Sequence, residues 1–162
     1  MKDQYDYILI DLHPNLGEQT TNGLAASDEA VVMLQCEPFC YNALDRYIEF
    51  VLAVKQELNP ELSIAGILPT MLDVRATVDN AVLADVRAEY EEFVFDTVIR
   101  RKARIKEFSS LGIQTSTKAD REALGERQTQ HTFLKVDLKV DRRVFVLPMR
   151  VSLASGCHLR LG

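Results

Sequence analysis

The chain has 162 residues and a formal net charge of −5, with 47% apolar and 27% charged residues. This length and balance predict one soluble globular domain and argue against a disordered chain. The apolar runs are too short to span a bilayer and the first residues, MKDQYD, are polar, so we expect a cytoplasmic protein without a membrane partner.

The first predicted element is a buried strand at residues 7–10, which is followed at once by Asp11 and then by a loop that ends at Gly17. An apolar run that closes on a carboxylate is typical of a parallel strand that carries a charge to the ligand-binding edge of an α/β sheet. Asp11 could also simply cap a loop, because apolar runs that end in Asp are common.

Helical and strand patterns then alternate along the chain. Strands are predicted at residues 30–36, 63–70 and 93–99, and helices at residues 18–27, 41–58, 78–90 and 117–127. Thr117 is the expected N-cap of the last helix. This alternation predicts an α/β fold with a doubly wound, mostly parallel sheet and helices on both faces.

The end of the chain has a different character. Residues 134–140 alternate apolar and charged side chains, and residues 143–153 are rich in apolar side chains. Residues 131–162 also carry six Lys and Arg against two Asp, although the whole chain is acidic. Two interpretations stay open: a small β-hairpin, or sequence produced by a frameshift or a fusion.

Five segments follow one another in a characteristic order. They are YDYILIDLHPNLG at residues 5–17, NGLAASD at 22–28, QCE at 35–37, GILPTMLDVR at 66–75 and TVIRRKARIKEFSSLG at 97–112. Together they resemble the later two-thirds of the ParA/Soj group of partition ATPases, which are relatives of MinD. The resemblance implies a P-loop NTPase domain of the deviant Walker type over residues 1–127 and a divergent tail at residues 128–162.

The resemblance also implies a chemistry. Members of this group bind ATP and Mg²⁺, dimerise around the nucleotide, coat DNA non-specifically and respond to a ParB-type partner. Asp11 matches the catalytic Walker B aspartate, which holds Mg²⁺ through water. The rim of the adenine pocket is matched by Thr70, Met71, Arg100 and Arg101. Arg75 and Arg104 match the DNA-binding arginines, although exposed arginines can also be ordinary solvated charges.

One departure limits these expectations. The group's phosphate-binding loop, KGGxGKT, has no counterpart among the seven scattered glycines. We therefore expect an incomplete sheet, and a chain that does not hydrolyse ATP alone. The leading hypothesis is a truncated partition protein, cytoplasmic and associated with the nucleoid. The alternative is a non-catalytic module that forms a homodimer, or a heterodimer with a full-length relative.

Overall fold

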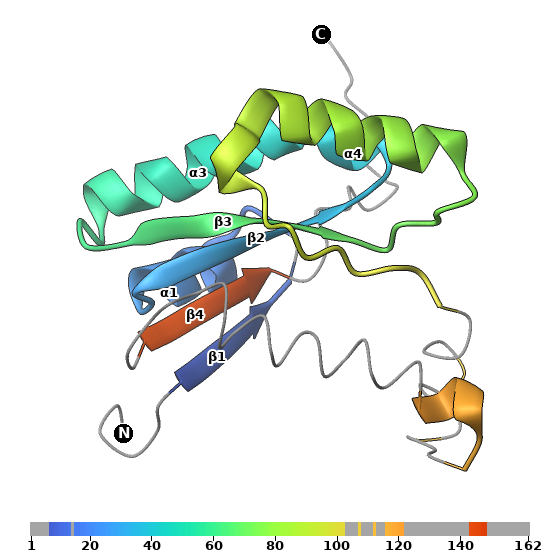
Figure 1. The fold of residues 1–162 in the computed structure, drawn as a ribbon. Helices are drawn as coiled ribbons and strands as arrows, with labels where there is room; N and C mark the ends of the chain where they lie inside the picture. The colour runs from blue at the N-terminus through green and yellow to red at the C-terminus, as the bar shows by residue number, and fades with distance from the viewer. Residues whose placement is uncertain are drawn as a thin grey trace, which may run out of the picture.

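The computed structural model describes residues 7–13, 15–102, 107, 112, 116–121 and 143–148. Four strands form one sheet in the order β1-β4-β2-β3, and every neighbouring pair is parallel (Figure 1). The strands are β1 (Tyr7–Leu12), β2 (Glu29–Gln35), β3 (Ser63–Thr70) and β4 (Arg143–Pro148). The helices are α1 (Glu18–Ala25), α2 (Pro38–Asn42), α3 (Leu44–Glu57), α4 (Thr77–Tyr90) and the 3₁₀ turn η2 (Glu91–Phe93). The predicted α/β class is confirmed.

One continuous core joins the helices to the sheet. Alternate residues of β2, such as Ala30 and Val32, are fully buried in a cluster with Leu24 of α1, Val51 of α3 and Val86 of α4. Val31 points to the opposite face of the sheet because side chains alternate along a strand, and it is also fully buried. Both faces of the sheet are therefore covered at β2, as parallel strands require.

The predicted helix at residues 41–58 is wrong in its start and its continuity. Helix α2 begins at Pro38, where the missing N–H and the fixed φ of proline suit the first helical turn. Ala43, with φ −95° and ψ −8°, separates α2 from α3. The chain therefore enters the helical layer directly from the end of β2.

The predicted strand at residues 93–99 is also wrong. Residues 94–100 run beside β3 but touch it only at separate points, where Phe95 N–H donates to Ile67 O (3.0 Å) and Ile99 N–H donates to Pro69 O (2.9 Å). Pro69 has no backbone N–H, so it cannot donate a hydrogen bond to the segment at residues 94–100. Regular strand pairing on this side of β3 therefore lacks one donor. The segment remains an irregular edge instead of a fifth strand.

The tail supplies a strand to the middle of the sheet. Strand β4 pairs with β1 over six positions, from Tyr7↔Arg143 to Leu12↔Pro148, and with β2 at Glu29↔Phe145 and Ala30↔Val146. The strand predicted within residues 143–153 therefore exists, but it lies between two strands of the main sheet (Figure 1). Its expected hairpin partner, residues 134–140, lies outside the described residues, so the hairpin stays a prediction.

The predicted N-cap at Thr117 is confirmed. Thr117 Oγ1 accepts from Asp120 N–H (3.1 Å), and Asp120 Oδ2 accepts from Thr117 N–H (2.8 Å). These reciprocal bonds satisfy two backbone groups at the start of the helical turn, as in a capping box.

Candidate functional site

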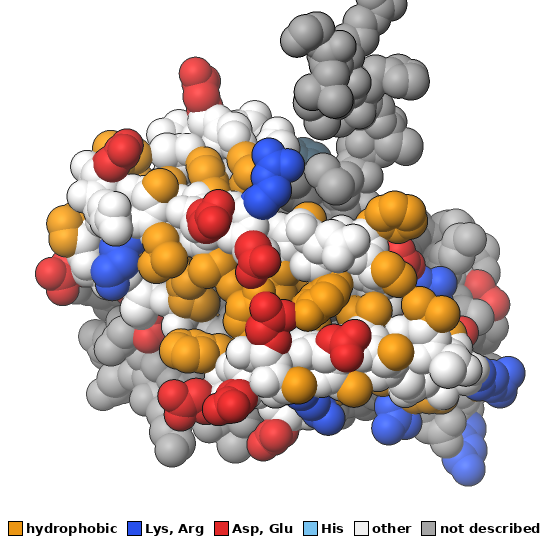
Figure 2. Space-filling model, turned by 90° about the horizontal axis from the view of Figure 1, so that it is seen from above, with side chains coloured by type: hydrophobic (Ala, Val, Ile, Leu, Met, Phe, Trp, Pro, Cys, Tyr) orange, Lys and Arg blue, Asp and Glu red, His pale blue; other side chains and the backbone are white. Residues whose placement is uncertain are grey.

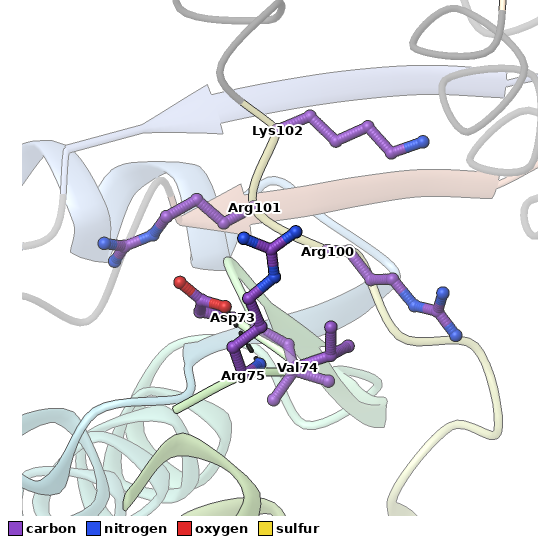
Figure 3. Close-up of a pocket in the computed structure, with 7 residues that line it drawn as sticks. Asp73, Val74, Arg75, Arg100, Arg101 and Lys102 are labelled. Carbon is purple, nitrogen blue, oxygen red and sulfur yellow. Dashed lines mark hydrogen bonds between the residues drawn. The ribbon is translucent and has the colours of Figure 1, made fainter. Parts of the chain in front are cut away.

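A pocket of about 440 Å³ opens at the carboxyl end of β3 (Figure 3). We call it the basic pocket, because four of its seven lining residues are Arg or Lys. It is lined by Leu72, Asp73, Val74, Arg75, Arg100, Arg101 and Lys102. The carboxyl edge of a parallel sheet is where ligands bind in open α/β folds, so this position favours a ligand site.

Backbone contacts bring the two halves of the basic pocket together. Met71 adopts a left-handed conformation (φ 58°), which turns the chain as it leaves β3. Leu72 N–H then donates to Ile99 O (3.2 Å), and Arg101 N–H donates to Leu72 O (2.8 Å). These bonds hold residues 72–75 beside residues 100–102, so the cations of the two segments are positioned by the main chain.

Asp73, the acidic residue of the basic pocket, is occupied by backbone hydrogen bonding. Its Oδ1 accepts from Arg75 N–H (3.0 Å), and its own N–H donates to Asp79 Oδ2 (3.0 Å) at the start of α4. Asn80 Nδ2 donates to Val74 O (3.1 Å), which fixes the same turn. The lining of the pocket therefore has four cationic side chains and one carboxylate, so its formal charge is positive.

The cationic side chains spread in different directions (Figure 3). The guanidinium of Arg75 rises between the two segments, Arg100 and Lys102 extend to one side, and Arg101 extends to the other. Arg101 forms an ion pair with Glu37, with Nη2 and Oε1 2.9 Å apart. This spread suits a ligand with several phosphates better than a single small anion.

Two residues predicted for the adenine rim are already used by the fold. Thr70 is 4% exposed, and its hydroxyl donates to Leu34 O (3.2 Å) across the sheet. Met71 serves as the left-handed turn residue described above. Their contact with a nucleotide stays a prediction.

Asp11 lies at the other side of the sheet from the basic pocket. It is exposed near the end of β1, and two strands, β4 and β2, separate β1 from β3. With about 4.8 Å between neighbouring strands, Asp11 is about 14 Å from the end of β3 across the sheet. The loop after Asp11 is tied down by Thr20, whose hydroxyl lies 2.6 Å from Asn15 O and 3.2 Å from His13 O.

The described residues do not fit a complete Mg·ATP site. Within the part of the chain that the structure describes, no three His, Cys, Asp or Glu side chains gather around a possible metal position. A single carboxylate such as Asp11 holds Mg²⁺ only together with substrate phosphates, and those phosphates need a cradle of their own. The sequence supplies no glycine-rich lysine loop for that purpose. Arg104, the second predicted DNA-binding residue, lies outside the described residues.

Charge is unevenly distributed over the described surface. In the view over α3 and α4, acidic side chains are spread among apolar ones across the middle, while Lys and Arg side chains are most frequent towards one edge and others lie at the left and near the top (Figure 2). Helices α3 and α4 contribute the exposed acids Asp45, Glu49, Glu57, Asp85 and Glu89. A polyanion is therefore repelled by the helical face and attracted to the edge of the sheet.

The structure unites residues that sequence reasoning assigned to two sites. Arg75 was predicted to bind DNA and Arg100 and Arg101 to bind nucleotide, yet all three line the basic pocket. Glu37 was not predicted to take part, although its position two residues after β2 placed it at the same edge of the sheet as Arg101.

Known proteins share this sequence over much of the chain. A family model described as an AAA domain matches residues 1–64. The chromosome partitioning protein ParA of Myxococcus xanthus is 41% identical over 109 residues, which are 67% of this chain and 38% of that protein. The sporulation initiation inhibitor protein Soj of Bacillus subtilis is 40% identical over 112 residues, 69% of this chain and 44% of Soj. The chain belongs to the ParA/Soj-type family.

This member spans less than half the length of these curated relatives. Its fold also resembles cobyrinic acid a,c-diamide synthase from Mycobacterium smegmatis, in a crystal structure that contains ADP and magnesium. That likeness has a TM-score of 0.55 and 29% identity, and it covers 77% of this chain and 46% of the synthase. The ParA/Soj-type chain therefore has the α/β fold of P-loop NTPases. None of its described helices has the length and hydrophobicity needed to cross a bilayer.

Proposed function

We propose that this ParA/Soj-type chain binds DNA without sequence preference through the basic pocket, as part of a partition system. The observation that carries the proposal is that Arg75 from one segment and Arg100 and Lys102 from another line the same pocket, because backbone hydrogen bonds hold the two segments together. Exposed arginines bind phosphates through permanently charged, planar forks, and phosphate contacts carry no sequence information. We also propose Arg104 as a DNA-binding residue, on the family resemblance alone.

The relatives' names support the wider role. Proteins described as chromosome partitioning ParA and as Soj are about 40% identical to this chain over two-thirds of its length. By that likeness, we propose a ParB-type protein as the partner and the nucleoid as the location in the cell. ATP and Mg²⁺ are the group's ligands, and hydrolysis by this chain requires a phosphate cradle that its own sequence does not supply.

The proposal is tested by fluorescence anisotropy with two labelled duplexes of unrelated sequence. We expect equal affinity for both duplexes. The logarithm of the binding constant should fall linearly with the logarithm of the salt concentration, and the magnitude of this slope should decrease by about one for each phosphate contact that is removed. Arg75→Ala and Arg100→Ala should each lower the affinity and the slope. Arg46→Ala, at an exposed position on α3, is the matched control and should change neither. Absence of binding at low salt would reject DNA as the ligand.

A second function, that of a non-catalytic dimerisation module, is favoured by one observation. Leu9 of β1 is an apolar residue that is 46% exposed, and within the described residues no strand lies on the outer side of β1. Such an edge accepts a strand from another chain. Light scattering of the purified chain, alone and mixed with a full-length relative, tests this function. A monomer under both conditions contradicts it.

A further inference from the structure

The turn that carries Arg75 joins the end of β3 to the start of α4. Its outer positions lie open to solvent, because Arg75 is exposed and Val74 is 52% exposed. Packing in the core therefore cannot fix the backbone at these two positions. The conformation of the turn depends on hydrogen bonds instead.

Asp79 and Asn80, close to the start of α4, hold this turn from the side of the helix. Asp79 Oδ2 accepts from Asp73 N–H (3.0 Å). Asn80 Nδ2 donates to Val74 O (3.1 Å) and to Ala76 O (2.7 Å). These bonds between side chain and backbone reach the residues immediately before and after the arginine.

Asp73 extends the network to Arg75 itself. Its Oδ1 accepts from Arg75 N–H (3.0 Å), and Figure 3 marks this bond with a dashed line. The Asp73 carbonyl accepts from Ala76 N–H (3.0 Å), which closes the turn. Because Asp79 fixes the N–H of Asp73, it acts on the backbone of Arg75 through a single intermediate residue.

We propose that Asp79 and Asn80 are positioning residues for DNA binding. They hold the turn in the conformation that presents the Arg75 guanidinium between the two segments of the basic pocket (Figure 3). This inference rests on the proposed function, because it concerns how Arg75 meets a phosphate. It adds two residues that act through Arg75 and do not themselves touch DNA.

Net charge and positioning predict opposite effects for Asp79. A carboxylate beside a DNA surface repels phosphates, so charge alone predicts that its removal strengthens binding. Positioning predicts weaker binding, because a loosened turn loses more conformational entropy when Arg75 binds a phosphate. For Asn80, which is neutral, charge predicts no change and positioning again predicts weaker binding.

The test is fluorescence anisotropy of a labelled duplex with the full chain and its variants. We expect Asp79→Ala and Asn80→Ala each to weaken binding about three- to tenfold, which is within the usual range for residues coupled in one hydrogen-bond network. Asp79→Asn keeps an acceptor oxygen and loses the charge, so it should bind DNA at least as well as the unaltered chain. Asp85→Ala, at an exposed position later in α4, is the matched control for charge and should not weaken binding.

A double-mutant cycle separates positioning from a general loss of stability. In an Arg75→Ala background the two alanine substitutions should no longer weaken binding, because the side chain that they position is absent. Asn80→Ala should stay folded, since alanine has the better helix propensity, and it keeps the test decisive if Asp79→Ala does not fold. Equal weakening in both backgrounds would overturn the inference, and so would stronger binding by Asp79→Ala.

Limited digestion with trypsin, which cleaves after arginine, tests the turn without DNA. Cleavage between Arg75 and Ala76 should be faster in Asp79→Ala and Asn80→Ala than in the unaltered chain, because a loosened turn is cleaved more readily. Mass spectrometry identifies the fragment that ends at Arg75. If the unaltered chain does not bind DNA, the proposed function fails, and faster cleavage still supports the positioned turn. Equal cleavage rates overturn the inference whether or not DNA binds.

Discussion

Arg101 Nη2 lies 2.9 Å from Glu37 Oε1, and this ion pair links the second residue after β2 to the segment that lines the basic pocket. The side chains are 46% and 40% exposed, so solvent screens the pair. Exposed pairs of this kind contribute about 0–1 kcal/mol to the free energy of unfolding. The contact therefore matters less for stability than for the direction in which Arg101 points, which is away from Arg100 and Lys102 (Figure 3).

Glu37→Gln should strengthen DNA binding. The substitution removes the charge that holds Arg101, so the arginine becomes available to a phosphate and the salt slope should rise by about one. Glu49→Gln, at an exposed acid on α3, is the control for a general change in net charge. Equal effects of the two substitutions on anisotropy titrations would show that Glu37 acts only through net charge.

Gly66→Ala should destabilise the fold by about 2–4 kcal/mol. Gly66 has φ 152°, and a Cβ there would lie 2.8 Å from Phe93 O and 2.9 Å from the Phe95 ring. Gly17→Ala is the matched control, because a Cβ at Gly17 meets its nearest atoms at 3.7 Å. Urea unfolding measures both variants, and a similar loss in both would contradict this account of the close approach.

Val146→Pro should lower the free energy of unfolding by about 3 kcal/mol or more, because proline in a central strand removes a ladder donor. Val146 pairs with Ile10 on one side and with Ala30 on the other. Glu18→Pro is the control, since Glu18 is the first residue of α1 and proline is tolerated there. Unchanged thermal unfolding of Val146→Pro would mean that β4 does not contribute to the stability of the sheet.

Stability should fall in alkaline solution partly through Cys36. Burial raises the pKa of this thiol from 9.0 to about 11, with Asp79 acting in the same direction. A raised pKa in the folded state stabilises the protein below pH about 9, and this contribution is lost as the pH rises through about 11. Because burial raises the pKa of Cys36 from 9.0 to about 11, the free energy of unfolding should fall by about 2–3 kcal/mol across this pH range.

Cys36→Ala isolates this contribution. A hydrogen bond to Glu89 raises the pKa of Tyr41 to about 12, so ionisation of Tyr41 also lowers the free energy of unfolding at high pH. The effect of Cys36 is therefore the difference between the unaltered protein and Cys36→Ala. Urea midpoints measured across this pH range should fall less steeply in Cys36→Ala. Parallel curves would contradict the effect of burial on the thiol.

Local patterns were sufficient for much of the fold. The strand at residues 63–70 was predicted with the bounds that the structure has, because both its apolar run and its flanking breaks lie within one short segment. Thr117 was identified as an N-cap from its hydroxyl side chain and from Asp120, which lies three residues later in the sequence. The predicted strand at residues 93–99 does not form, because its regularity depends on a backbone donor that Pro69, 24 residues before residue 93, does not supply.

The sequence by itself determined the α/β class, the order of strands and helices from β1 to α4 and the family, because periodicity, breaks and motif spacing are local properties. Only the tertiary structure placed β4 between β1 and β2, since pairing between strands more than a hundred residues apart leaves no periodic trace. It also brought Arg75 beside Arg100, through the hydrogen bonds of Leu72 with Ile99 and Arg101. Two separately predicted sites became one pocket because the backbone joins their segments in space.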